Sequence, residues 1–232
     1  MASAWLRTIG LVIRGLVFDF DGLILDTEVP VYRAWAEVYE RHGHRLSEEF
    51  WTTIIGRGST YFDPIAELEG RLGYELDREA VRAAKRLREM ELVRQLEVLP
   101  GVVEWREEAA ALGVVLGVAS SSSRSWVLGH LERLGLDGWA CVRCGDDVED
   151  AKPAPDVYLA VLACMGVQPH EAIAVEDSGA GLRAAKEAGL YCVAVPNAMT
   201  AGHDFAPADR VLGSLAETSF REVAAAAGAA RP

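Results

Sequence analysis

Short apolar runs alternate with helical patterns along most of this 232-residue chain, and the alternation limits the folds that it can adopt. The apolar runs are bounded by turn residues, which predicts strands that are buried on both faces. They lie at residues 15–20, 114–119, 172–175 and 191–195, with weaker candidates near 139–144 and 209–212. The helical patterns between them lie at residues 102–112, 123–134, 156–166 and 179–188. We therefore predict an α/β fold, a doubly wound, parallel, Rossmann-like sheet with helices on both faces.

Residues 29–98 differ from the rest because they contain no convincing strand and are predicted to form successive helices. The first helix is expected to begin near Pro30 and to place Val31 and Trp35 on one face. This pattern predicts a helical insertion after the first strand. The expected division is an α/β core domain at residues 1–26 and 99–232 and a helical cap domain at residues 27–98.

The charge of the chain excludes several classes of partner. Lys and Arg number 23 against 35 Asp and Glu, and the formal net charge of −12 argues against nucleic-acid or anionic-membrane binding. No apolar run reaches the roughly 18 residues of a membrane-spanning helix. The N-terminus also lacks the basic start and the cleavage site of a secretory signal. We expect a cytoplasmic protein, monomeric by default, that acts on a small molecule.

The cysteines raise the question of a metal or redox site. Cys141 and Cys144 form a CxxC pattern, but a zinc site would need a second such pair or nearby histidines, and only the isolated Cys164 and Cys192 remain. Positions i and i+3 of a strand also face opposite sides, which is poor geometry for a shared metal. We therefore expect ordinary reduced, partly buried thiols. A redox role for Cys141 and Cys144 is the alternative.

Polar side chains follow several of the predicted strands at the point where each strand ends. The carboxyl ends of parallel strands meet at one edge of a sheet, where ligands bind. The side chains expected at that edge are Asp19, Asp21, Ser120, Ser121, Glu176 and Asp177, joined by Lys152 from a loop. Carboxylates are costly to bury beside one another unless a cation compensates, and carboxylate oxygens are the ligands that hard divalent cations prefer. The sequence therefore predicts a divalent-cation site with a phosphate beside it.

The same residues identify a family. The motifs are DFDGLILDTE after the first strand, VASSS, KPAPDVY and VEDSGAGLRAAKEAG, in that order along the chain. Together they resemble the motifs of the haloacid dehalogenase-like superfamily, in the branch that carries a helical cap after the first strand. The resemblance covers residues 15–215 and extends to β-phosphoglucomutases and small-molecule phosphatases of that branch.

The resemblance implies a role for each residue. Asp19 would be the nucleophile that becomes an aspartyl-phosphate, and Asp21 the general acid and then the general base. Mg²⁺ would be the cofactor. Its implied ligands are Asp19, the backbone carbonyl of Asp21, Asp177 and, directly or through a neighbour, Glu176. Ser120 and Lys152 would hold the phosphate oxygens.

Two positions distinguish the reactions of the superfamily. Dehalogenases and phosphonatases lack an aspartate at the place of Asp21, so phosphate-ester chemistry is favoured. Mutases that resemble β-phosphoglucomutase carry a histidine at the place of Val31, so a phosphatase is favoured over a mutase. A metal-binding protein without enzymatic activity is a third hypothesis, and the complete set of motifs argues against it.

Substrate-binding residues are harder to assign from the sequence. Arg57, in the loop at residues 56–59, is a candidate for gripping an anionic or hydroxylated substrate, and a solvated loop arginine is the alternative. Ser121 is a second candidate. Thr27 is a third, with a simple helix N-cap as its alternative. Trp126 is predicted to act mainly in packing.

Overall fold

The core is a six-stranded parallel sheet in the order β3-β2-β1-β4-β5-β6. The computed structural model describes residues 13–57 and 61–229; the N-terminal segment considered above as a signal, and residues 58–60 of the Arg57 loop, lie outside these ranges. The strands are β1 (Gly15–Phe18), β2 (Val115–Ala119), β3 (Cys141–Arg143), β4 (Ala172–Glu176), β5 (Tyr191–Ala194) and β6 (Arg210–Val211). The predicted α/β class, with a parallel sheet, is confirmed.

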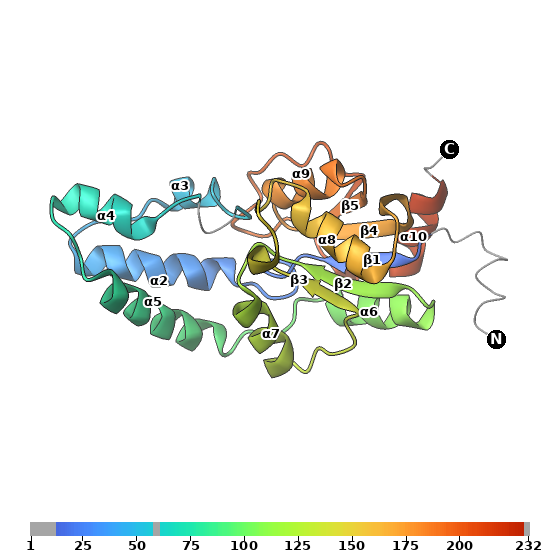
Figure 1. Cartoon of the computed structure of the whole chain (residues 1–232), viewed down its shortest axis with the longest axis horizontal. Helices are drawn as coiled ribbons and strands as arrows, with labels where there is room; N and C mark the ends of the chain where they lie inside the picture. Colours follow the sequence, from blue (N-terminus) through green and yellow to red (C-terminus); the bar gives the residue numbers. More distant parts are fainter. Residues whose placement is uncertain (1–12, 58–60, 230–232) are drawn as a thin grey trace.

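Helices cover both faces of this sheet (Figure 1). Because successive side chains of a strand point to opposite faces, Leu16 and Phe18 of β1 pack on one side and Val17 on the other. The first side is covered by α6 (Val102–Ala111), α7 (Arg124–Arg133) and α10 (Phe220–Ala229). The second side is covered by α8 (Asp156–Met165) and α9 (Gly179–Glu187). Burial on both faces explains why the strands are continuous apolar runs.

The segment between β1 and α6 is helical and lies beyond one end of the sheet (Figure 1). It consists of α2 (Glu28–Arg41), α3 (Glu48–Thr52), α4 (Pro64–Leu72) and α5 (Arg78–Val93). The helices α3, α4 and α5 are capped at their N-termini by the side chains of Ser47, Asp63 and Asp77, which accept hydrogen bonds from backbone N–H groups. The division at residues 27 and 98 stays a prediction.

The helical cap has a hydrophobic cluster of its own, which includes Val38, Tyr39 and Trp51. Met199, from the loop after β5, joins that cluster. In the same loop, Nδ1 of His203 accepts a hydrogen bond from the Gly179 N–H, and its Nε2 lies 2.6 Å from the Thr52 carbonyl oxygen at the end of α3. One loop of the core therefore contacts the cap directly.

The two chain segments that join the core to the cap lie side by side. Leu25 and Val98 form an antiparallel bridge, and the Leu99 N–H donates to the Ile24 carbonyl at 2.9 Å. Both connections between core and cap therefore run next to each other beyond the end of β1.

The prediction that all cysteines are reduced thiols is wrong for one pair. Cys141 of β3 and Cys164 of α8 form a disulfide that spans 23 positions of the chain, whereas Cys144 and Cys192 are buried free thiols. The CxxC spacing did not identify the partner of Cys141, because that partner, Cys164, lies in the helix that packs on its strand. No helix in the described ranges is long and apolar enough to cross a membrane.

Candidate active site

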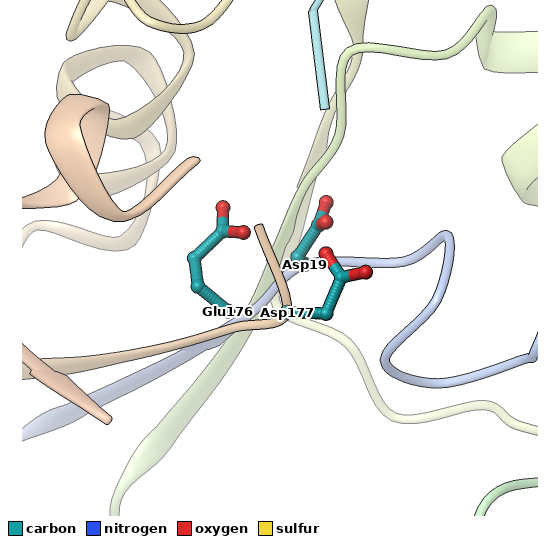
Figure 2. A group of neighbouring side chains, drawn as sticks. All are labelled: Asp19, Glu176 and Asp177. Carbon is teal, nitrogen blue, oxygen red and sulfur yellow. The ribbon is translucent and has the colours of Figure 1, made fainter. Parts of the chain in front are cut away.

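The carboxyl ends of β1 and β4 bring three acidic side chains together (Figure 2). Asp19 follows β1, Glu176 ends β4, and Asp177 follows it. One carboxylate oxygen from each lies within 4.8 Å of the others. The exposed fractions are 5% for Asp19, 0% for Glu176 and 1% for Asp177, so water screens this charge poorly. The predicted convergence of these residues is therefore present.

Lys152 supplies a positive charge inside the cluster. Its Nζ donates to Asp19 Oδ1 at 2.8 Å, to Glu176 Oε1 at 2.6 Å and to the Ala119 carbonyl at 2.9 Å. Burial alone would lower the pKa of Lys152, but the carboxylates of Asp19 and Glu176 outweigh it and raise the pKa. Lys152 therefore stays charged and orients the Asp19 carboxylate.

One ammonium group does not balance the negative charge of the cluster. Burial, reinforced by the charge of Glu176, raises the pKa of Asp19 to about 7. Burial and the charge of Asp19 raise the pKa of Asp177 well above its usual value. In the absence of a further cation, both groups are therefore weaker acids than ordinary carboxyl groups.

The donor set suits a hard divalent cation. Carboxylate oxygens are the ligands that Mg²⁺ prefers. A bound cation would offset the negative charge of Asp19 and Asp177 that Lys152 leaves unbalanced. Partners already hold two of the acids in place. Tyr158 donates to Glu176 at 2.5 Å, and Asn197 Nδ2 donates to Asp177 Oδ2 at 2.8 Å.

Gly22 leaves room for one of these acids. Its φ is +78°, and a Cβ at this position would come within 2.2 Å of Asp177 Oδ2. Any larger residue would therefore both strain the backbone and displace this carboxylate.

Asp21 lies apart from the three-acid cluster and is held by polar side chains from three places in the chain. It accepts hydrogen bonds from Thr27 Oγ1 at 2.6 Å, Ser122 Oγ at 2.6 Å and Trp126 Nε1 at 2.8 Å. The Ser120 hydroxyl lies 3.5 Å from its Oδ2. These donors fix the direction in which the Asp21 carboxyl points.

Two of these contacts differ from what the sequence predicts. Thr27 makes no side-chain cap hydrogen bond to α2, so the alternative of a simple N-cap is not supported. Trp126 packs against the apolar core as predicted, but its indole N–H also donates a hydrogen bond to Asp21, which was not predicted.

A cavity of about 1070 Å³ lies between the core and the cap. Asp19, Asp21 and Lys152 line it from the core, together with Ser120 and Ser121. These predicted site residues therefore share a single cavity, whereas Glu176 and Asp177 lie behind Asp19 and Lys152 and are not part of its lining.

The cap wall of the cavity carries Arg57 and Val31. The Arg57 guanidinium stacks over the Tyr61 ring, 4.2 Å from its centre, while the Ser121 hydroxyl lies 3.4 Å from the Gly56 carbonyl. Arg57 and Ser121, both predicted to contact substrate, thus lie where a substrate in the cavity could meet them.

The comparison with known families agrees with this geometry. The sequence profile described as haloacid dehalogenase-like hydrolase matches residues 16–195. This chain belongs to that family. The match begins in β1 and ends just after β5, so it includes the four motifs and the inserted cap. The predicted family is confirmed.

Named relatives include phosphatases. YhcW of Bacillus subtilis, named for an inferred phosphatase activity, is 41% identical over 89% of this chain and 94% of its own length. Fructose-1-phosphate phosphatase YqaB of Escherichia coli is 35% identical over 78% of this chain and 95% of its own. The crystal structure of CbbY from Rhodobacter sphaeroides with phosphate has a TM-score of 0.74 at 31% identity, covering 88% of this chain and 96% of CbbY. The prediction of a haloacid dehalogenase-like phosphatase is therefore confirmed at the level of the family.

Proposed function

We propose that this protein is a Mg²⁺-dependent phosphatase that hydrolyses small phosphomonoesters, sugar phosphates among them, through an aspartyl-phosphate at Asp19. The observation that carries the proposal is the contact of Lys152 with Asp19 inside a buried acidic cluster that opens to a large cavity. A buried carboxylate whose orientation is fixed by an ammonium group is suited to act as a nucleophile.

The first step forms the intermediate. An Asp19 oxygen attacks the phosphorus of the bound ester, and a new P–O bond forms while the bond between phosphorus and the leaving oxygen breaks. Lys152 and Ser120 hold phosphate oxygens and stabilise the charge that develops on them. Asp21 donates a proton to the leaving oxygen, which departs as an alcohol.

The second step regenerates the enzyme. Asp21 takes a proton from a water molecule whose oxygen attacks the phosphorus, and the bond to Asp19 breaks to release inorganic phosphate. The hydrogen bonds from Thr27, Ser122 and Trp126 support this role because they orient the Asp21 carboxyl before each proton transfer.

The cation removes a large electrostatic barrier. A carboxylate about 3.5 Å from a phosphate dianion is repelled by roughly 9 kcal/mol at an effective dielectric constant of about 20. Lys152 cannot offset this repulsion while it also neutralises Glu176. Asp19 and Asp177 would hold the Mg²⁺, with Glu176 beside them. When bound, the ion would neutralise the charge of the transferred phosphoryl group.

Sugar phosphates are the favoured substrates because relatives act on or bind them. YqaB is named for fructose 1-phosphate, and a CbbY variant of Rhodobacter sphaeroides, 31% identical to this chain, was crystallised with xylulose 1,5-bisphosphate. A cavity of about 1070 Å³ accommodates such molecules.

A phosphosugar mutase is the alternative, and the cavity lining disfavours it. Val31 lines the cavity at the place where the mutases carry a histidine, and an alkyl side chain cannot transfer a proton to a second sugar hydroxyl. A mutase would convert a hexose 1-phosphate to the 6-phosphate, given a catalytic amount of bisphosphate, without excess inorganic phosphate. We expect phosphate release instead.

A panel of phosphomonoesters, assayed with Mg²⁺ and with EDTA, tests the proposal. We expect Mg²⁺-dependent phosphate release that Asp19→Asn lowers by about 10³-fold or more. Asp146→Asn is the matched control, because this exposed carboxylate accepts a hydrogen bond from the backbone N–H of Arg124 and lies outside the cavity lining. No release above the EDTA level for any ester, or full activity of Asp19→Asn, contradicts the proposal.

A further inference from the structure

One loop of the core reaches both the acidic cluster and the cap. It follows β5 directly and comprises residues 195–203, which we call the β5 loop. Near its start, the side chain of Asn197 contacts Asp177 of the cluster. Further along, Met199 packs into the hydrophobic cluster of the cap, and His203 bonds the end of a cap helix. Three side chains of one loop therefore connect the acids to the cap.

Asn197 is held in one orientation by its neighbours. Its amide oxygen accepts the backbone N–H groups of Met199 at 2.9 Å and Thr200 at 3.1 Å. Because these groups can only donate, they determine which end of the amide is the oxygen. The amide nitrogen therefore faces the other way, where it donates to Asp177 Oδ2 at 2.8 Å and to the Gly22 carbonyl at 3.2 Å. Asn197 cannot turn away from Asp177 without breaking hydrogen bonds within its own loop.

The Asn197 amide acts on an acid whose charged form is costly. Asp177 is 1% exposed, and its carboxylate lies within 4.8 Å of that of Asp19, so burial and like charge both disfavour ionisation. A cation binds the ionised form, and an N–H donor stabilises that form. Groups that bond a metal ligand from behind typically change metal affinity by about 10–100-fold. Asn197 is therefore suited to position Asp177 for a cation.

The other end of the β5 loop is fixed by the cap. Met199 is 6% exposed because it belongs to the hydrophobic cluster of the cap. His203 accepts the Gly179 N–H at Nδ1, which must therefore be unprotonated. Its Nε2 then carries the hydrogen and donates to the Thr52 carbonyl at the end of α3. The cap thus contacts this loop through one apolar side chain and one hydrogen bond.

A hydrogen-bonded turn connects the two ends of the loop. Thr200 is 0% exposed, and its hydroxyl accepts the Asn197 N–H at 3.0 Å. The Thr200 carbonyl accepts the His203 N–H at 2.9 Å. A cap that moved away from the loop would therefore disturb the same bonds that hold Asn197. Coupling between two sites is carried by contiguous contacts of this kind.

We propose that Asn197 is a positioning residue for Asp177, and that contact of the β5 loop with the cap keeps it in place. Met199 and His203 make that contact, so the affinity of the site for Mg²⁺ depends on the position of the cap. The inference rests on the proposed function, because the cation is the one assigned to the acidic cluster. Coupling is reciprocal, so a bound cation strengthens the contact between cap and loop by the same factor.

Calorimetric titration with Mg²⁺ alone tests the positioning role. Asn197→Leu keeps the approximate size of the side chain but removes its N–H donor. We expect the Kd for Mg²⁺ to rise by about tenfold or more. His170→Asn is the control, because His170 is exposed and lies in the core, in the short helix Pro169–Glu171, and its Kd should equal the wild-type value. An unchanged Kd in Asn197→Leu overturns the inference.

Two substitutions of His203 separate its contact with the cap from its contact with the core. The amide nitrogen of Gln can take the place of Nε2, so His203→Gln keeps a donor for the Thr52 carbonyl. The amide oxygen of Asn can take the place of Nδ1, so His203→Asn keeps an acceptor for the Gly179 N–H but loses the bond to the cap. We expect His203→Asn to raise the Kd for Mg²⁺ by about fivefold, and His203→Gln by no more than about twofold. Equal values for the two variants, or the opposite order, contradict the role of the cap.

Hydrogen exchange in the cap measures the reciprocal effect. The N–H groups of Thr53 and Ile54 close the end of α3 by bonding the carbonyls of Phe50 and Trp51, next to the contact with His203. Saturating Mg²⁺ should slow the exchange of this segment in the wild-type protein, and it should slow it less in Asn197→Leu. Equal exchange with and without Mg²⁺ in the wild-type protein would show that the cation and the cap are not coupled.

These measurements separate the inference from the proposed function. If the wild-type protein neither binds Mg²⁺ nor hydrolyses phosphomonoesters, the proposed function fails, and the inference fails with it. If it binds Mg²⁺ and hydrolyses esters while Asn197→Leu and His203→Asn bind Mg²⁺ as the wild type does, only the role of the β5 loop is wrong.

Discussion

The core and the cap hold their charges in different ways. In the core, Lys152 lies between Asp19 and Glu176 with side chains at most 8% exposed. In the cap, the ion pair of Arg41 with Glu37 joins side chains that are 57% and 32% exposed, at 3.8 Å. Water can replace a partner in this exposed pair of the cap, but not in the Lys152 cluster of the core. Removing the charge of Lys152 should therefore have a large effect on stability, and removing that of Arg41 a small one.

The cavity between the two regions combines both kinds of charge. Its core wall carries Asp19 and Lys152, which are buried and joined by a hydrogen bond. Its cap wall has exposed arginines, Arg82 and Arg86, that form no ion pair with a carboxylate in the part of the chain that the structure describes. We infer that the core determines the reaction and that the cap determines which phosphate esters bind.

The largest difference should come from Lys152→Met. Removing this ammonium leaves Asp19 and Glu176 buried without their shared partner, so we expect a loss of about 3–5 kcal/mol in the free energy of unfolding. Arg41→Met in the cap should cost no more than about 1 kcal/mol. Urea denaturation of both variants in EDTA makes the comparison. Equal losses would mean that the two regions do not differ as described.

The disulfide should have the next largest effect, and it should act on the core. Cys141 and Cys164 join β3 to α8, on either side of the loop that carries Lys152. Opening a loop of this length should lower the free energy of unfolding by about 3 kcal/mol. Urea denaturation with and without a reductant measures it.

Cys164→Ser supplies the control for the reductant. This variant lacks the bridge already, so reductant should leave its stability unchanged. If reductant destabilises both proteins equally, the effect does not come from the bridge between β3 and α8.

The effect of pH on the metal-free core should be smaller. The pKa of Asp19 rises from 3.8 to about 7 on folding, so between these values the folded state binds more protons than the unfolded state. The stability of the metal-free protein should therefore fall as the pH rises from 4 to 7. Mg²⁺ competes with those protons, so it should raise Tm more at pH 8 than at pH 5.

Thermal unfolding with Mg²⁺ and with EDTA at both pH values measures this difference. Asp19→Asn should weaken the dependence on pH, because its side chain does not titrate. An equal rise in Tm at pH 5 and pH 8 would show that the cation does not bind at the titrating acids.

Much of the core could be predicted from the sequence. The predicted helix at residues 156–166 is observed as Asp156–Met165, and the predicted strand at 172–175 as Ala172–Glu176. The meeting of Asp19, Glu176 and Asp177 was also predicted, because parallel strands place their carboxyl ends at one edge. These features could be predicted because alternating strands and helices form a parallel sheet, which fixes where the strand ends lie.

The remaining features depend on contacts between distant parts of the chain. The disulfide joins Cys141 to a residue of the helix packed on its strand, and no local spacing reveals that neighbour. Trp126 donates to Asp21, which lies 105 positions away in the chain. The sequence around a helical tryptophan does not show which distant group its indole N–H will meet. Nor could the sequence show that Arg82 and Arg86 line the catalytic cavity, since that depends on how the cap lies over the core.

The most direct test of the central claim is to trap the intermediate. The enzyme is mixed with a ³²P-labelled phosphomonoester and Mg²⁺, quenched in acid during turnover, digested, and mapped by mass spectrometry. We predict a phosphorylated peptide whose modified residue is Asp19, absent in EDTA and absent in Asp19→Asn. Steady turnover with no label on Asp19, or with label on another residue, would contradict the mechanism.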